Sequence, residues 1–423
     1  MSGATVASES ARHVSEPAPR VDARRVIADL RALDRLTGGP DGARRVCWGE
    51  EWRVARDFLT ELLVEIGLEP ERDEAGNLWA YMNGEATPAL AVGSHVDSVP
   101  TGGWLDGALG VMAAVGVLRA WAGVDQRPPR ALALVDWADE EGARFGRSLF
   151  GSSAVAGTLD PAELADLRDA GGERIGSVLA ANGVELARAP EAATRRERFG
   201  AYLELHIEQG PMLEAEGPAI AAVSGCVGVE RRRFTIRGQA SHAGATPMDR
   251  RRDAGLAAAD AALRIEQLPA REGGVATTGS LRLEPGIPTA VAGVAELLVD
   301  LRHPDAAGLE RMLEAAQTAV GDAAAERRCE ADSELVWRID PIPFDPQLVQ
   351  AARESCREVV GSDRVLTSGA LHDAAEMARV LPAEMIFCAS IGGISHAPEE
   401  DTAEEDLAAG IEAYAALASR ALT

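Results

Sequence analysis

Residues 89–100 read ALAVGSHVDSVP, an apolar run that turns abruptly into a polar loop. The run has the length and composition of a buried strand. An apolar stretch at 107–121 follows and predicts a buried helix, and residues 131–142, ALALVDWADEEG, form a second apolar run that ends in acids. Strands, polar loops and helices that alternate in this order are typical of a mainly parallel α/β sheet with helices on both faces.

Elements of the same kind are predicted on both sides of this unit: helices near 26–36, 51–66 and 402–418, and strands at 77–82 and 383–390. Thr402 and Glu405 have the spacing of a capping box, so the last of these helices is expected to begin at Thr402. Because the α/β pattern occurs near both ends of the chain, we predict that the two ends belong to one domain.

Between residues 219 and 341 the pattern changes to that of a small α+β domain. The segments RRRFTIRGQ at 231–239 and VAGVAELLVDLRH at 291–303 have the alternation of strands in an antiparallel sheet, and helices are predicted at 252–265 and 307–320. The predicted division is a disordered tail (1–20), a catalytic domain in two segments (21–218 and 342–423) and an inserted α+β domain (219–341).

The composition excludes several classes of function. A net charge of −25 disfavours nucleic acid and anionic membrane surfaces as partners. No apolar run is long enough to span a bilayer. The five cysteines are odd in number and lack CxxC spacing, which predicts reduced thiols and a cytoplasmic location. The chain has no lysine, so a Schiff-base lysine, a P-loop lysine and a carboxylated lysine between two metals are all excluded.

Side chains that can bind a metal ion follow several of the predicted strands: His95, Asp106, Glu141, His206 and His396. Ligands gather at the carboxyl ends of strands in an open α/β sheet, so these side chains are expected to converge. They suit a pair of divalent ions such as zinc or manganese, and the two oxygens of Asp106 could bridge the pair. Taken singly, each residue has an ordinary alternative: a solvated loop histidine, a helix N-cap aspartate or a surface acid.

Two further acids, Asp97 and Glu140, lie beside these residues in the sequence. Asp97 is expected to fix the tautomer of His95, because a ligating imidazole usually donates its other N–H to a carboxylate or carbonyl. Glu140 and Glu141 are neighbours on an extended chain and point in opposite directions. One of these two carboxylates can therefore bind metal while the other reaches the substrate water.

Several motifs resemble the hydantoinase/carbamoylase type of metallo-amidase: GSHVDSVPTGGWLDGALGV, DEEGARFGRSLFGS, HIEQGP, GQASHAGATPMDRRRDA, VDLRHPD, SGALHDA and GISHAPEED. This family includes N-carbamoyl-L-amino-acid hydrolases, allantoate amidohydrolases and β-ureidopropionases, and it is related to dinuclear aminoacylases and carboxypeptidases. The resemblance covers nearly the whole chain after the tail. It implies a dinuclear metallohydrolase domain with an inserted lid and dimerisation domain.

The resemblance also implies a role for each metal-site residue. One ion would be bound by His95, Asp106 and His206. The second would be bound by Asp106, Glu141 and His396, and Glu140 would be the general base. Related peptidases typically have an acidic ligand at the position of His206, so this residue favours the amidase branch.

The remaining site residues are assigned by the same motifs. His242 would stabilise the oxyanion and would come from the partner subunit of a homodimer. The residues expected to bind substrate are Gln209, His242, Thr289, Arg302, Ser368 and Gly369. Arg302 would bind the substrate carboxylate through its planar guanidinium. Thr289 replaces an asparagine of the family pattern, and a hydroxyl there has a shorter reach.

The expected reaction is hydrolysis of a C–N bond in a small substrate that carries a carboxylate, and the first choice is an N-carbamoyl-L-amino acid. Allantoate and β-ureidopropionate are close alternatives, and N-acyl amino acids or dipeptides are more distant ones. A catalytically silent binding protein on the same fold is a further alternative. The expected cofactors are two divalent ions per subunit, drawn from zinc, manganese, cobalt and nickel.

Overall fold

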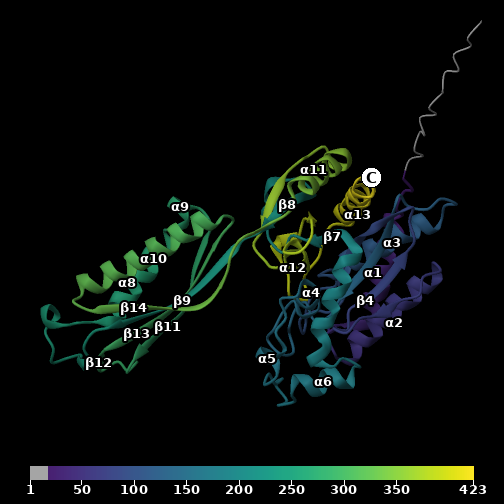
Figure 1. Ribbon diagram of the computed structural model, residues 1–423. Helices are drawn as coiled ribbons and strands as arrows, with labels where there is room; N and C mark the ends of the chain where they lie inside the picture. The colour runs from purple at the N-terminus through teal and green to yellow at the C-terminus, as the bar shows by residue number, and fades with distance from the viewer. Residues whose placement is uncertain (1–17) are drawn as a thin grey trace, which may run out of the picture.

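A nine-stranded mixed sheet forms the larger of two lobes in the computed structural model, which describes residues 18–423 (Figure 1). Its four central strands are parallel and lie in the order β17-β7-β5-β6. They are β5 (Ala86–His95), β6 (Arg130–Trp137), β7 (Phe199–Ile207) and β17 (Ala383–Cys388). The expectation of a mainly parallel α/β sheet is confirmed.

Shorter strands extend this sheet on both edges. The strand pairs β3-β4, β4-β6, β8-β17 and β8-β15 are antiparallel, whereas β16 runs parallel to β8. The bounds are β3 (Glu71–Arg72), β4 (Leu78–Met82), β8 (Ile220–Cys226), β15 (Ile342–Pro343) and β16 (Val365–Ser368). The parallel centre therefore lies between antiparallel edges, and its carboxyl ends meet at one edge of the sheet.

Helices surround this sheet and complete the core of the larger lobe. Helix α3 (Ala108–Ala122) is buried on nearly every side, as its apolar sequence predicts. The other α-helices are α1 (Ala23–Thr37), α2 (Glu50–Glu65), α4 (Phe150–Ala156), α5 (Pro161–Leu164), α6 (Ile175–Ala181), α7 (Met212–Glu216), α11 (Pro346–Val360), α12 (Asp373–Ala378) and α13 (Glu404–Ala421). Two 3-10 helices, η1 (Leu186–Arg198) and η3 (Ile391–Gly393), lie in the connections.

The predicted capping box at the last helix is wrong. Helix α13 begins at Glu404, and its N-cap is Ala403, which has no side chain to cap it. The hydroxyl of Thr402 donates instead to the carbonyl of Ala389 at 2.8 Å. That bond ties the start of α13 to the end of β17, a tertiary contact that competes with local capping.

The smaller lobe is a four-stranded antiparallel sheet in the order β11-β13-β9-β14. Its strands are β9 (Gly228–Arg237), β11 (Val275–Glu284), β13 (Val294–His303) and β14 (Glu330–Ile339). Helices α8 (Ala254–Glu266) and α10 (Ala306–Glu326) pack on one face of the sheet around a separate hydrophobic core. A short helix, α9 (Pro269–Glu272), follows α8.

The predicted start of the inserted domain, at residue 219, needs correction. Residues 219–226 were assigned to the inserted domain, but β8 pairs with β17 and β16 in the larger sheet. The chain crosses to the smaller lobe only where β9 begins, at Gly228. Of the predicted tail, residues 1–17 lie outside the described part of the chain.

A small ribbon of chain lies at the end of the smaller lobe that points away from the larger one, where Figure 1 labels β12. It consists of β10 (Ser241–His242) paired with β12 (Ala290–Val291), followed by η2 (Met248–Arg250). In the larger lobe, β1 (Gly38–Gly39) and β2 (Gly42–Ala43) form a separate two-stranded sheet. None of the helices between residues 18 and 423 combines the length and apolar character of a membrane span.

Candidate metal centre and active site

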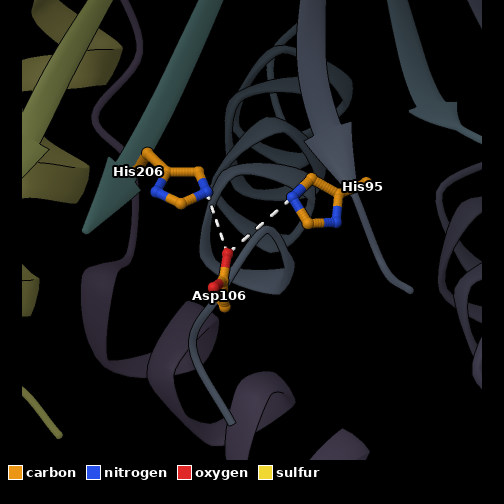
Figure 2. Close-up of side chains that lie close together, drawn as sticks. All are labelled: His95, Asp106 and His206. Carbon is orange, nitrogen blue, oxygen red and sulfur yellow. Dashed lines mark ion pairs between the residues drawn. The ribbon is translucent and has the colours of Figure 1, made fainter. Parts of the chain in front are cut away.

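Three of the predicted ligands meet at the carboxyl edge of the larger sheet (Figure 2). His95 ends β5, His206 lies near the end of β7, and Asp106 lies in the turn before α3. Oδ1 of Asp106 is 3.1 Å from Nε2 of His206 and 3.8 Å from Nε2 of His95. All three side chains are buried.

The turn after Asp106 requires a glycine. Gly107 has φ +63, and a Cβ on it would lie 2.3 Å from the ring of His95. Any side chain here would collide with a ligand, and the backbone conformation itself favours glycine. Because residue 107 is a glycine, the carboxylate of Asp106 and the imidazole of His95 can lie close together.

A second group shares the carboxylate of Asp106. Oδ2 of Asp106 lies 3.2 Å from Nε2 of His396, which lies in turn 3.5 Å from Oε2 of Glu141. Glu141 follows β6 and His396 follows η3, so this group comes from two loops that are distant in sequence. The five residues thus form two triads, His95-Asp106-His206 and Asp106-Glu141-His396, in each of which the ligand atoms lie within 4.8 Å of one another.

The donor atoms fit divalent cations. Nδ1 of His95 lies 3.0 Å from the carbonyl of Asp97, and Nδ1 of His206 lies 2.9 Å from the carbonyl of Ile207. These contacts place a ring proton on each Nδ1, so each Nε2 is the atom that can bind a cation once it gives up any proton of its own. Within residues 18–423, Nε2 of His206 and Oε1 of Glu141 are buried and have no hydrogen-bond partner. Buried polar atoms without partners are costly, and a bound ion would satisfy both.

The pKa values of the ligands reflect their crowding. Burial lowers the pKa of His95 to about 3. Burial opposes the charged form of His206, but the interaction with the Asp106 carboxylate outweighs it and raises the pKa to about 9. The hydrogen bond to Asp106 likewise raises the pKa of His396 to about 9. Burial and the charge of Asp106 raise the pKa of Glu141 to about 7.

Asp97 holds the ring of His95, as the sequence predicts. Its backbone carbonyl, rather than its carboxylate, fixes the ring of His95. The carboxylate accepts the backbone N–H groups of Glu140 and Glu141, each at 3.2 Å. The side chain of Asp97 therefore orients the loop that carries the two glutamates, because it accepts hydrogen bonds from two backbone amides of that loop.

Glu140 lies beside the first triad. Its Oε2 is 3.8 Å from Nε2 of His95, and its carboxyl is buried. Burial and the neighbouring charges of Asp373 and Glu141 raise its pKa well above the usual range for a glutamate. A carboxylate that binds a proton readily beside a cation site has the properties of a general base.

A cavity of about 280 Å³ connects the metal ligands to the smaller lobe. Of the predicted substrate-binding residues, it is lined by Gln209, Arg302 and Gly369. Nε2 of Gln209 donates to Oδ2 of Asp106 at 2.8 Å. Nη1 of Arg302 donates to the carbonyl of Gly369 at 2.7 Å, and its Nε donates to Asp300. Arg302 thus lines the same cavity as the metal ligands, from β13 of the smaller lobe.

Ser368 is not among the residues that line this cavity. It is buried, and its hydroxyl lies 3.1 Å from Nε2 of His372 and 2.8 Å from the carbonyl of Ala370. The predicted contact between Ser368 and substrate is therefore not present in this arrangement. The hydroxyl instead orients His372, which does line the cavity.

The structure does not bring His242 and Thr289 to the cavity. Both lie in the β10–β12 region at the far end of the smaller lobe (Figure 1), where the N–H of Ala243 donates to the carbonyl of Thr289 at 2.9 Å. Nδ1 of His242 accepts the backbone N–H groups of Gly244 and Ala245, each at 3.1 Å. The ring proton therefore lies on Nε2, on an exposed side chain that can donate a hydrogen bond outward.

Several lining residues received no role from the sequence. His372 is fully buried, and its ring centroid lies 4.4 Å from that of His206. Burial and the neighbouring charge of His206 hold its pKa well below the usual range. Its position in SGALHDA, a motif already singled out, was the available signal. Arg231 and Trp337 also line the cavity, but their strands carry no motif that marks them.

Comparisons with known proteins identify the family to which this chain is related. The model of the peptidase family M20/M25/M40 matches residues 91–420. The N-carbamoyl-L-amino acid amidohydrolase of Geobacillus stearothermophilus is 38% identical over 377 residues, which cover 88% of this chain and 91% of that protein. The allantoate amidohydrolase of Escherichia coli (strain K12) is 35% identical over 384 residues, 88% of this chain and 92% of that protein.

A solved structure extends the likeness to the whole fold. The hydantoinase/carbamoylase family amidase of Burkholderia phymatum is 33% identical and has a TM-score of 0.87, with 96% of this chain and 99% of that chain covered. The match spans both lobes and every element that carries a ligand. The chain therefore belongs to the peptidase family M20/M25/M40, and within it to the hydantoinase/carbamoylase group of amidases.

Proposed function

We propose that this protein is a cytoplasmic amidohydrolase that uses two divalent ions to hydrolyse an N-carbamoyl-L-amino acid to the amino acid, ammonia and carbon dioxide. The observation that carries the proposal is the position of Asp106, which shares its carboxylate between two ligand triads on one wall of the cavity. Arg302, which comes from the smaller lobe, lines the same cavity. A substrate with a carboxylate at one end and a ureido group at the other fits this cavity, because the carboxylate can pair with Arg302 while the ureido group lies at the ligand triads.

The metal ions would be held by the two triads. When bound there, they would supply Lewis acidity and lower the pKa of a shared water toward neutrality. Zinc, manganese, cobalt and nickel all accept imidazole and carboxylate ligands.

The side chains around the cavity divide the remaining work. Arg302 binds the substrate carboxylate in a bidentate pair, and Gln209 hydrogen-bonds the ureido group. Glu140 accepts the proton of the attacking water and then gives it to the leaving nitrogen. Burial and the neighbouring acids raise the pKa of Glu140, which favours its acceptance of the proton from the attacking water.

A second copy of the chain would complete the site. His242 presents an Nε2–H at the far end of the smaller lobe and does not line its own cavity. We propose a homodimer formed through the inserted domain, in which His242 of one chain donates to the developing oxyanion in the other. Thr289 would arrive with it, because the two segments are hydrogen-bonded.

Allantoate and β-ureidopropionate are the alternative substrates. Both carry a carboxylate near a ureido group, and one relative that covers most of the chain is an allantoate amidohydrolase. Thr289 stands where the family pattern has an asparagine, so the contacts of the substrate carboxylate differ here from that pattern. The imidazole of His206 disfavours the peptidase alternative, and the complete set of ligands together with Glu140 disfavours a silent binding protein.

The proposal is tested by ammonia release from the manganese-loaded protein. The panel contains several N-carbamoyl-L-amino acids, β-ureidopropionate and allantoate, each with a chelator-treated control. We expect metal-dependent release, greatest with an N-carbamoyl-L-amino acid. If a protein that holds two ions releases ammonia from none of them, the proposal is overturned, and N-acyl amino acids and dipeptides become the substrates to assay.

A further inference from the structure

We propose that Glu400 is a positioning residue of the metal centre, whose buried carboxylate holds Asp106 between the two triads and joins its loop to the loop of His396. The proposal rests on the metal centre proposed above. It adds a residue that binds neither metal nor substrate. Glu400 lies in GISHAPEED, four residues after His396, and is fully buried despite its charge.

Both oxygens of Glu400 are used on ligand loops. Oε1 accepts the backbone N–H groups of Leu105 at 3.1 Å and Asp106 at 3.0 Å. Oε2 accepts the hydroxyl of Ser395, the residue before His396, at 2.9 Å. A single carboxylate therefore holds the backbone on which Asp106 is mounted and the side chain beside His396. Charge-assisted hydrogen bonds of this kind are roughly twice as strong as neutral ones.

The hydroxyl of Ser395 forms a direct link to the ligand. Its Oγ lies 2.9 Å from Oε2 of Glu400 and 3.2 Å from Oδ2 of Asp106. Oδ2 is the oxygen that faces His396. Glu400 is thus linked through a single hydroxyl group to the Asp106 oxygen of the second triad, so a change in its side chain is expected to alter that triad first.

The loop before Asp106 packs closely against the carboxylate of Glu400. A Cβ on Gly103 would lie 2.0 Å from Oε1 of Glu400, so the loop before Asp106 packs directly against the charged group. The same two loops are joined a second time, because Nε1 of Trp104 donates to Oδ1 of Asp401 at 3.2 Å. The close packing leaves no room for a side chain at position 103 beside Glu400.

A buried arginine balances the charge and holds the third ligand loop. Arg45 is fully buried, and its guanidinium interacts electrostatically with Glu400 and Asp106. Its Nε donates to the carbonyl of Val96 at 2.7 Å, and its backbone N–H donates to the hydroxyl of Ser98 at 3.1 Å. Both contacts fix the loop that follows His95. A buried carboxylate is tolerated when an opposite charge and several hydrogen bonds compensate it.

The test is a titration of the chelator-stripped, full-length protein with manganese or zinc. Glu400→Gln keeps the size of the side chain but cannot accept hydrogen bonds at both ends. We expect it to weaken binding of the second ion equivalent by about 10- to 100-fold. Glu399→Gln, an exposed neighbour in the same motif, is the matched control and is expected to bind both ions as the unmodified protein does.

A second variant separates positioning from folding. Ser395→Ala removes only the hydroxyl between Glu400 and Asp106, so we expect weaker binding of the second ion with an unchanged melting temperature of the metal-free protein. If both variants bind two equivalents with unaltered dissociation constants, the proposal is overturned. It is also overturned if Glu400→Gln lowers the melting temperature while Ser395→Ala binds normally, because the role is then structural.

If Glu400→Gln does not fold, Ser395→Ala decides the question alone. The titration contains no substrate, so it is independent of the proposed reaction. A protein that binds two ions and hydrolyses no ureido compound would overturn the proposed function and leave the role of Glu400 standing.

Discussion

Oδ1 of Asp106 lies 3.1 Å from Nε2 of His206, and this contact leaves Oδ2 of the same carboxylate to face the second triad. The geometry divides one acid between two groups of ligands. It also explains why the pKa of Asp106 is held well below its usual range: burial opposes ionisation, but the contacts with His206 and His396 outweigh it. The site is therefore ready to bind cations through an ionised bridge.

Glu140 can be tested by replacement with glutamine. Glu140→Gln cannot accept a proton, so we expect turnover to fall by at least about 100-fold, within the usual range for a general base. Both metal ions should remain, because Glu140 belongs to neither triad. Metal content and steady-state kinetics measure the two effects, with Glu399→Gln as the control. Substantial activity in the glutamine variant would remove Glu140 from this role.

Arg302 is expected to act mainly in binding. Arg302→Ala removes a charge-assisted pair with the substrate carboxylate, a loss of about 2 kcal/mol. That corresponds to a rise in KM of about 30-fold, with a smaller change in kcat. Arg282→Ala, an exposed arginine on β11, is the control and should leave both constants unchanged. An unaltered KM in Arg302→Ala would contradict the assignment.

The shared site can be tested by complementation. Glu140→Gln and His242→Ala are each expected to be inactive, because each lacks one group of the same site. When the two variants are mixed and exchange subunits, a hybrid dimer carries one site with both groups intact. We expect partial recovery of activity, measured after exchange is demonstrated with labelled chains. If exchange occurs without recovery, His242 does not act across the dimer.

Removal of the metal should lower the stability of the larger lobe. Ions that bind only the folded chain stabilise it by about 2.7 kcal/mol at a concentration 100 times their dissociation constant. We expect the melting temperature to fall by several degrees after chelation and to recover when manganese is added. His206→Ala, which lacks one ligand, should show a smaller recovery. An identical melting temperature with and without metal would argue against a built ion site.

Glu384 should make stability depend on pH. Its Oε1 accepts the N–H of Val223 at 3.3 Å, and its Oε2 has no partner within residues 18–423. Burial raises its pKa well above the ordinary value of 4.5. At a pH above 4.5, Glu384 loses its proton in the unfolded chain but retains it in the folded chain. The free energy of unfolding therefore falls as the pH rises toward the pKa of Glu384 in the folded chain.

The measurement for Glu384 is urea unfolding at about pH 5 and about pH 8. Glu384→Gln removes the titrating group, so it should gain stability relative to the unmodified chain at the higher pH. The gain is about 1.4 kcal/mol for each unit of difference between the folded and unfolded pKa. Glu354→Gln, on the exposed side of α11, serves as the control. An equal difference between the two proteins at both pH values would show that Glu384 ionises normally in the folded chain.

The sequence identified much of the metal centre because its signals are local. The apolar run before His95 predicts β5, and the ligand-type residues after β5, β6 and β7 follow from the rule that such side chains gather at the carboxyl ends of parallel strands. The resemblance to a known family then supplied the roles. What it did not reveal was the use of each atom. Asp97 was expected to fix the ring of His95 through a carboxylate or a carbonyl, and only the structure shows that the carbonyl makes this contact.

The same limit applies to the residues behind the ligands. Glu400 is one of several acids in a charged stretch, and nothing in its neighbours indicates that it is buried against the loop of Asp106. Thr402 was predicted to cap the last helix, but its hydroxyl donates a hydrogen bond to the carbonyl of Ala389. By itself the sequence determined the strands, the loops and the type of ligand, because hydrophobic period and residue chemistry act locally. Only the tertiary structure decided which oxygen or amide meets which partner, because those contacts depend on how the loops pack at the edge of the sheet, and the one between Glu400 and Asp106 joins residues 294 apart.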